Sequence, residues 1–329
     1  MTAQTVSPPP TGETHTGPSL SPSRAADFKT CPLLFRFRTI DKLPEQPSAD
    51  QVRGTLVHAV LERLFDLPAA ARTPAAAADL VAPAWAALVA AEPALAEIFA
   101  AATSPARVAD PAAIAAEADA TGQEALIDAL PDASSPDEAA RLATFLGGAT
   151  ALLDGYFAVE DPQRLEPAER ETLISTLVDD SLLIRGYIDR LDVSPAGDLR
   201  VVDYKTGGAP REAFEGRALF QLKFYALVLW RTRGVVPRVL RLLYLKDAEI
   251  CDYSPEASEL ERFERTLVAL SEAIERAKRD QDFRPKPSRL CGWCSHQSRC
   301  PEFGGTPPPF PTGEPVRIDL TPADDDRLG

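Results

Sequence analysis

Four cysteines stand out as residues that could bind a metal. Cys291, Cys294 and Cys300 follow a C-x2-C-x5-C pattern near the end of the chain, and Cys31 lies near its start. Three thiols crowded into ten residues suit a soft metal centre better than disulfides, and an odd total of five argues against a complete disulfide framework. The fifth, Cys251, is expected to be a small buried apolar side chain. The pattern predicts one metal centre that joins both ends of the chain.

A second set of residues could hold a harder metal ion. Asp203 and Lys205 are two apart in Asp203-Tyr204-Lys205, so on a strand both side chains face the same side. Asp189 lies on the preceding predicted strand and could pair with Asp203 across a hairpin. Two nearby carboxylates repel, and a divalent cation such as Mg²⁺ or Mn²⁺ keeps both ionised. The alternative for a lone D-x-K is an ion-paired strand edge, because such short matches are common.

Three further residues lie where they could complete this second site. Gln221 and Tyr225 are four apart on the helix predicted after the Asp203-Tyr204-Lys205 strand, so they share one helix face. His58 sits in an apolar helical stretch, where a lone histidine is more often buried and hydrogen-bonded than a metal ligand. Its imidazole is nevertheless a common metal ligand in proteins.

A sheet with helices around it is needed to position these side chains. Strand-like runs cover 171–178, 182–193, 199–205 and 239–245, with turns at 179–181 and 195–198. Helices are predicted from Ser21, around 54–64, at 212–230 and at 258–279. The order predicts an α/β fold with a mixed central sheet flanked by helices.

Composition divides the chain into segments. Residues 1–20 are expected to be a disordered tail and 304–329 a flexible acidic tail. Residues 21–303 are expected to form one domain, with the sheet core at 169–252 and the cysteine segment at 283–303. The Ala-rich, Pro-punctuated stretch 68–155 is expected to be an insertion of several short helices.

The charge is uneven along the chain. The formal net charge is −14, yet residues 201–250 hold nine Lys and Arg against five Asp and Glu, whereas 131–180 hold three against eleven. A basic face on 201–250 could therefore still attract a polyanion. No apolar run looks long enough to span a bilayer, and no G-x4-G-K-[ST] motif occurs. We therefore expect a cytoplasmic protein without a membrane segment or a P-loop motor.

The combined motifs resemble a known family. The set comprises Gly54-x3-His58, Gly186-x2-Asp189-Arg190, Asp203-Tyr204-Lys205-Thr206-Gly207, Gln221-x3-Tyr225 and the four cysteines. It is similar to the RecB-type branch of the PD-(D/E)XK nucleases, in particular to stand-alone iron–sulfur exonucleases and CRISPR-associated adaptation nucleases. The likeness covers about 21–67 and 169–303 and leaves the Ala-rich stretch unexplained. Ile188 stands where many family members have proline.

The resemblance implies a restriction-endonuclease-like core with assigned roles. His58, Asp189, Asp203 and the Tyr204 carbonyl would hold Mg²⁺ or Mn²⁺, and Lys205 would orient the attacking water. Gln221 and Tyr225 would position Lys205 or the DNA backbone.

The resemblance also implies a [4Fe–4S] cluster held by Cys31, Cys291, Cys294 and Cys300. Spacing alone would favour a four-cysteine zinc site, and the nuclease motifs shift the expectation to iron–sulfur. His296, between the ligands, could replace one cysteine but is expected to be a surface residue.

The function implied is that of a metal-dependent DNA exonuclease. It would hydrolyse phosphodiester bonds at single-stranded ends in repair or recombination, with a helicase or repair protein as a partner. Arg217 and Lys223 would contact DNA, and Phe35, Phe37 and Tyr187 would stack on bases or belong to the core. Two alternatives stay open: a non-catalytic DNA-binding or scaffold subunit of a helicase–nuclease assembly, and a zinc-stabilised interaction module.

Overall fold

The structure, a computed structural model, describes residues 14–99, 136–209, 215–311 and 318–319. Its centre is a six-stranded sheet in the order β2-β4-β5-β6-β7, with β3 paired to β4. The strands are β2 (Ser19–Leu20), β3 (Glu169–Val178), β4 (Leu182–Val193), β5 (Leu199–Lys205), β6 (Val239–Tyr244) and β7 (Glu249–Tyr253). Pairs β3–β4, β4–β5 and β6–β7 are antiparallel, whereas β2–β4 and β5–β6 are parallel. The predicted mixed sheet is therefore confirmed.

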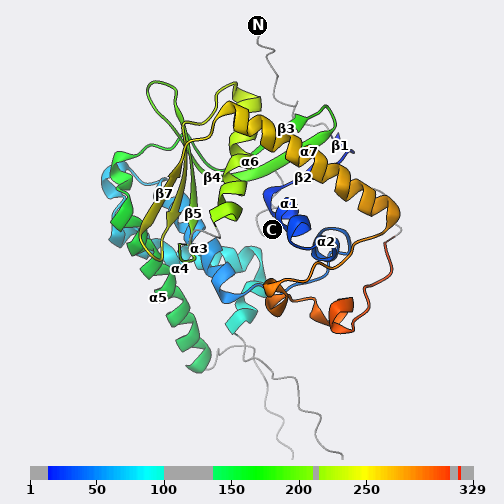
Figure 1. Cartoon of the computed structure of the whole chain (residues 1–329). Coiled ribbons are helices and arrows are strands. Elements are labelled where there is room, and N and C mark those ends of the chain that lie inside the picture. The colour runs from blue at the N-terminus through cyan, green and yellow to red at the C-terminus, as the bar shows by residue number, and fades with distance from the viewer. Residues whose placement is uncertain (1–13, 100–135, 210–214, 312–317, 320–329) are drawn as a thin grey trace, which may run out of the picture.

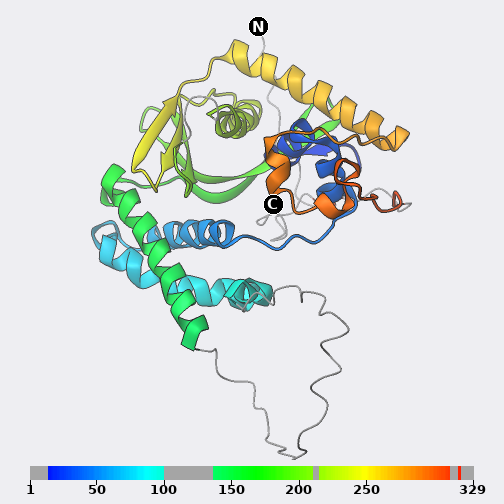
Figure 2. The same ribbon diagram turned by 60° about the horizontal axis from the view of Figure 1, so that its bottom comes forward.

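Helices cover both faces of this sheet (Figures 1 and 2). On one face lie α6 (Glu215–Arg233) and α7 (Ala257–Asp280), and on the other α3 (Ala49–Leu64), α4 (Pro74–Ala91) and α5 (Pro136–Val159). Val201 belongs to the core under α6, and its neighbour Val202 belongs to the core under α3. Because successive strand residues point to opposite faces, β5 is buried on both sides.

The Ala-rich stretch differs from its prediction. In its described part it forms two long helices, α4 and α5, with the short turns η2 (Ala69–Ala71) and η3 (Pro93–Phe99), and residues 100–135 lie outside the described ranges. A Cβ on Gly155 of α5 would lie 1.8 Å from the Leu245 carbonyl oxygen, so only glycine lets this helix approach the end of β6. The stretch is thus one of the layers that cover the sheet.

Both long helices have unusually apolar compositions because alanine dominates them. Pro74–Ala91 and Asp137–Val159 are long and apolar enough to cross a membrane by length and composition alone. This corrects the prediction that no segment reaches that threshold. Their side chains Trp85, Phe145 and Leu153 pack with α3 in one core, although only 22% and 28% of the two apolar stretches are buried.

The N-terminal and C-terminal segments lie side by side (Figure 2). The first contributes α1 (Pro22–Thr30), α2 (Pro32–Phe35) and the π-helical turn η1 (Arg36–Ile40), and the second contributes η6 (Arg289–Trp293), η7 (Gln297–Arg299) and η8 (Pro301–Phe303). Phe283 stacks on Phe35 on one side and on Phe310 on the other, with ring centroids 6.3 and 6.0 Å apart. An aromatic stack therefore joins the two segments.

Order extends beyond the predicted domain limits of 21 and 303. Ser19–Leu20 already pairs with β4, and β1 (Thr14–His15) pairs with β8 (Ile318–Asp319) in a separate two-stranded sheet. Residues 1–13, 312–317 and 320–329 of the two predicted tails lie outside the described ranges.

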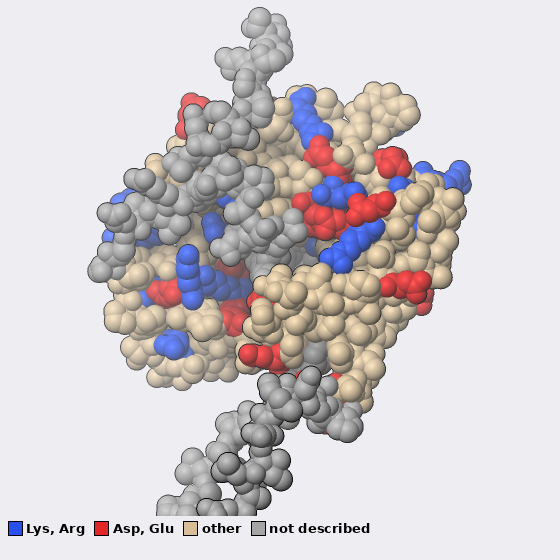
Figure 3. Space-filling view, turned by 180° about the vertical axis from the view of Figure 1, so that it is seen from behind, with Lys and Arg blue, Asp and Glu red and all other residues tan. Residues whose placement is uncertain are grey.

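The expected basic face on residues 201–250 is largely neutralised. The structure describes the side chains of seven of its nine cations, and six of these pair with carboxylates within 4.0 Å, namely Lys205, Lys223, Arg231, Arg233, Arg238 and Arg241. On the face of the molecule drawn in Figure 3, positive and negative side chains lie beside each other. This part of the chain therefore offers much less free positive charge than its sequence predicts.

Candidate active site

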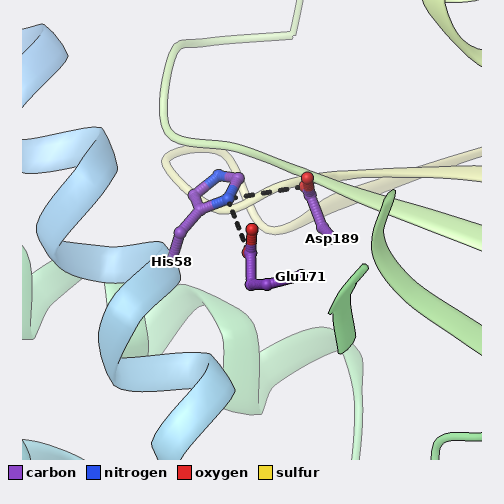
Figure 4. A group of neighbouring side chains, drawn as sticks. All are labelled: His58, Glu171 and Asp189. Atoms are coloured by element: carbon purple, nitrogen blue, oxygen red, sulfur yellow. Dashed lines mark ion pairs between the residues drawn. The ribbon is translucent and has the colours of Figure 1, made fainter. Parts of the chain in front are cut away.

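The first part of the site is a histidine on α3. Ser48 and Gln51 form a reciprocal capping box at the start of this helix, and the hydrophobic residues on the buried side of the helix pack under the sheet. His58 projects from it toward the strands: its Nε2 lies 3.0 Å from the Tyr204 carbonyl oxygen. Its Nδ1 lies 3.5 Å from Glu171 Oε1 and 3.6 Å from Asp189 Oδ2 (Figure 4). Helix α3 thus brings an imidazole against two strands.

The second part is the point where β4 and β5 separate. Their ladder ends at the pair Arg190 and Val202, and Asp189 would be opposite Asp203 at the next position. Asp189 Oδ2 instead accepts a 2.7 Å hydrogen bond from the Tyr204 backbone N–H. The carboxylate thereby replaces a ladder partner and is fixed beside the His58 ring.

The third part is Glu171, which the sequence reasoning did not select as a site residue. It lies on β3 between the paired positions Arg170–Arg190 and Thr172–Ile188, and so faces Asp189 across the strands. Its φ is +42°, a left-handed conformation that costs free energy in a non-glycine residue and is typical of functional sites. Counting back along the hairpin from its turn would have paired 171 with 189.

A chain of polar contacts on the α6 side completes the site. Asp203 is 1% exposed, and its Oδ2 lies 2.6 Å from Lys205 Nζ. Lys205 also donates to Gln221 Oε1 at 2.8 Å, and Gln221 Nε2 donates to the Tyr225 hydroxyl at 2.9 Å. A Cβ on Gly186 would lie 2.7 Å from the Tyr225 ring, so this glycine makes room for the tyrosine.

Burial and the crowded charges shift the protonation of these groups. Burial alone would lower the pKa of His58, but Asp189, Glu171 and Asp203 raise it to about 9. Burial raises the pKa of Asp189 to about 7; His58 works against this rise, and Asp203 and Glu171 add to it. Burial alone would lower the pKa of Lys205, but the nearby carboxylates of Asp203 and Asp189 raise it overall. Without a metal the site therefore retains protons near neutral pH.

The donor atoms suit a hard divalent cation. One ligand atom from each of His58, Glu171 and Asp189 lies within 4.8 Å of the other two, and Asp203 adjoins them through Lys205. Carboxylate oxygens are the ligands that Mg²⁺ and Mn²⁺ prefer. With neutral His58, the three carboxylates and Lys205 carry a net charge of −2, which a divalent ion balances. The residues present thus fit such an ion.

The four cysteines line one pocket between the N-terminal and C-terminal segments. All four are half-buried, and no disulfide joins any of the chain's five cysteines, which all lie in described ranges. Backbone N–H groups of Lys286 and Ser288 donate to the sulfurs of Cys31 and Cys291. Burial and the nearness of the other three thiols raise the pKa of Cys300. The four cysteines thus share one pocket lining, but among the described residues no three of their sulfurs lie within 4.8 Å of one another, so the predicted ligand set stays a prediction.

Several other predicted residues lie elsewhere. Lys223 is on the far side of α6 from Gln221 and Tyr225, and it pairs with Glu259 of α7 at 2.6 Å. The Arg217 side chain is outside the described residues. Phe35 and Phe37 are 3% and 2% exposed, so they belong to the core rather than to a stacking surface, whereas Tyr187 is half-buried.

His296 also differs from its prediction as a surface residue. It is 4% exposed, its Nε2 lies 2.5 Å from Glu45 Oε1, and its ring packs edge-on against Phe37. It therefore holds the cysteine segment to the N-terminal segment.

Comparison with known proteins identifies the fold family. A sequence profile of the PD-(D/E)XK nuclease superfamily matches residues 19–301. No curated protein matches the chain. One solved structure, described as "Crystal structure of SSO0001", is 20% identical over 49% of this chain and 71% of its own, with a TM-score of 0.33. A similarity that low carries no structural argument.

Proposed function

The chain belongs to the PD-(D/E)XK nuclease superfamily of metal-dependent nucleases, and we propose that it is an exonuclease acting on single-stranded ends of DNA. The observation that supports a catalytic role most strongly is the meeting of His58, Glu171 and Asp189, from three separate elements, beside the Asp203–Lys205 pair. A non-catalytic subunit would not need this crowded, half-buried set of charges, whose assembly costs desolvation free energy.

Each side chain has a proposed role. His58, Asp189, Asp203 and the Tyr204 carbonyl would hold Mg²⁺ or Mn²⁺, and we add Glu171 to this set. A bound ion of this kind would supply a Lewis acid that activates water and neutralises charge on the scissile phosphate. Lys205 would orient the water and stabilise the same charge, because its ammonium stays protonated between two carboxylates. Gln221 and Tyr225 would hold Lys205 in position.

The four cysteines that line one pocket could hold a metal centre. We propose that Cys31, Cys291, Cys294 and Cys300 hold a [4Fe–4S] cluster. The support is the cysteine spacing together with the nuclease motifs, which resemble iron–sulfur members of the family. A four-cysteine zinc site is the alternative.

We further propose that the protein belongs to the RecB-type branch of the superfamily. The support is the sequence set of His58, Asp189-Arg190, Lys205, Gln221-x3-Tyr225 and the four cysteines. A role in cytoplasmic DNA repair or recombination, with a helicase or repair protein as partner, belongs to the same proposal.

The test is a cleavage assay on end-labelled DNA. Protein purified without oxygen would be incubated with single-stranded, duplex and circular DNA, in Mn²⁺, in Mg²⁺ and in EDTA. We expect shortening of linear single strands with a divalent ion and no cleavage in EDTA. Cleavage of circular DNA would show an endonuclease, and cleavage in EDTA would contradict the metal site.

A further inference from the structure

The most exposed large apolar side chain of the described residues lies in the cysteine segment. Trp293, between Cys291 and Cys294 on η6, is 83% exposed. Phe303 on η8, at 51%, is also exposed close to the cysteine pocket that it lines. Burying a tryptophan is strongly favourable, so its exposure on a folded surface indicates a contact surface.

The charge around Trp293 is opposite to that of the whole chain. Residues 283–303 carry four cations against one acid, Glu302, in a chain whose net charge is −14. Of these cations, Arg289 and Arg299 are exposed, and within the described residues neither forms an ion pair with a carboxylate. Unpaired arginines beside an exposed aromatic ring match a partner that has both phosphates and flat apolar bases.

Helix α1 connects this surface to the proposed active site. At its start Pro22 packs beside Gly186, the residue that also makes room for Tyr225. Directly after its end, Cys31 lines the cysteine pocket. Nine helical residues span about 14 Å. Helix α1 therefore runs from the surroundings of Tyr225 to the cysteine pocket.

We propose that Trp293, flanked by Arg289 and Arg299, is a stacking platform for unpaired bases of single-stranded DNA. This rests on the proposed function, because it assigns a substrate form to the same nuclease. Single strands fit better than duplex, since only unpaired bases offer a free face to the indole ring. The platform also replaces Phe35 and Phe37 as the stacking aromatics, because both are buried.

Equilibrium binding to a fluorescent single-stranded oligonucleotide tests the platform. The anaerobically purified full chain would be measured in EDTA, so that cleavage cannot interfere. We expect Trp293→Ala to raise the Kd roughly 5- to 150-fold, the range for loss of one base–aromatic stack. Trp293→Phe should stay near the wild-type value. Leu177→Ala, at another exposed apolar position on β3, is the matched control and should change nothing.

Tryptophan fluorescence gives a second readout that does not depend on the alanine variant folding. Single-stranded DNA should quench the emission of the wild-type chain, which has three tryptophans, and this quenching should be lost in Trp293→Phe. Unchanged quenching in Trp293→Phe, or an unchanged Kd in a folded Trp293→Ala, would overturn the platform and leave a protein partner as the occupant.

The cleavage assay separates this proposal from the nuclease assignment. Trp293-dependent binding in a protein that never cleaves would support the platform and contradict the proposed function. Cleavage of single strands by a protein whose DNA binding does not depend on Trp293 would support the proposed function and contradict the platform.

Discussion

At the scale of single residues, the site balances closely spaced charges of opposite sign, of which only that of Asp203 is fully buried. Glu171, Asp189 and Asp203 surround the imidazole of His58 and the ammonium of Lys205. A bound divalent ion would displace the protons that these groups share and would neutralise more of the negative charge of the carboxylates. The affinity for metal and the affinity for protons should therefore oppose each other.

Glu171 can be tested as a metal ligand by one substitution. Glu171→Gln keeps the shape of the side chain and removes its charge, so the Kd for Mn²⁺ should rise by at least the roughly 10- to 100-fold that loss of a group supporting a ligand costs. Isothermal titration measures this directly. Glu169→Gln is the control on the same strand, because Glu169 pairs with Arg233 of α6. Equal Kd values for the two variants would remove Glu171 from the site.

The stability of the metal-free protein should depend on pH. His58 and Asp189 have folded pKa values of about 9 and about 7, both above their ordinary values. A group whose pKa is higher in the folded state than in the unfolded state stabilises the fold fully at pH values below its unfolded-state pKa. This contribution is lost as the pH rises through the folded-state pKa. The Tm in EDTA should therefore fall between pH 6 and pH 9, whereas saturating Mn²⁺ should flatten the change. A Tm in EDTA that rises over this range would contradict the assigned shifts.

Strand periodicity was enough to group Asp189, Asp203 and Lys205 from the sequence. Glu171 could not be found in that way, because its position depends on the hairpin register and on an unusual backbone conformation. The ion pair of Lys223 also could not be predicted from the sequence, since its partner Glu259 lies on another helix.

At the scale of elements, a buried arginine ties the helical layer to the sheet. Arg190 is 0% exposed and makes two hydrogen bonds to Glu160, the residue directly after α5. It also donates to the Tyr204 hydroxyl at 2.9 Å. Because the Tyr204 backbone contacts His58 and Asp189, α5 helps to fix β5 at the site.

Two glycines of α5 test how closely this helix packs on the sheet. Gly155→Ala should destabilise the protein by roughly 1–3 kcal/mol, because its Cβ would collide with the Leu245 carbonyl. Gly147→Ala, on the same helix with no atom within 4 Å of its Cβ, should stabilise it by about 0.5–1 kcal/mol. Urea unfolding measures both. Effects of the same sign would contradict the described packing of α5.

The sequence predicted the element bounds best where periodicity and turns agreed. Strand β4 has its predicted limits, Leu182–Val193, and the turn before it places Asp179 and Asp180 at φ of +52° and +53°. Strand β7 was missed because its five residues, Glu-Ile-Cys-Asp-Tyr, are few and do not alternate polar and apolar side chains. The role of α4 and α5 was missed because alanine gives no strong apolar stripe.

At the scale of the whole molecule, the two ends of the chain form one layer beside the sheet. The cysteine pocket, the stack of Phe35, Phe283 and Phe310, and the His296–Glu45 pair all join them. A cluster bound by the four cysteines would thus be one of several links, and its loss should loosen this layer more than the sheet.

Cys31 and Cys251 form a matched pair for testing the cluster. Cys31→Ser should abolish the visible absorbance near 400 nm and reduce the iron below about four per chain, because it removes one of four ligands. Cys251→Ser, on β7 and away from the pocket, should keep both. Stoichiometric zinc in a colourless wild-type protein would contradict the cluster.

The central claim is that the carboxylate–lysine site cleaves DNA. Single-turnover cleavage of an end-labelled single strand by Lys205→Ala, with DNA binding measured in the same preparation, tests it most directly. We expect the cleavage rate to fall about 1,000-fold or more while binding is retained, because Lys205 is needed only at the reacting phosphate. Lys246→Ala, at an exposed position just after β6, should cleave normally. A wild-type rate in Lys205→Ala would contradict the assignment of the active site.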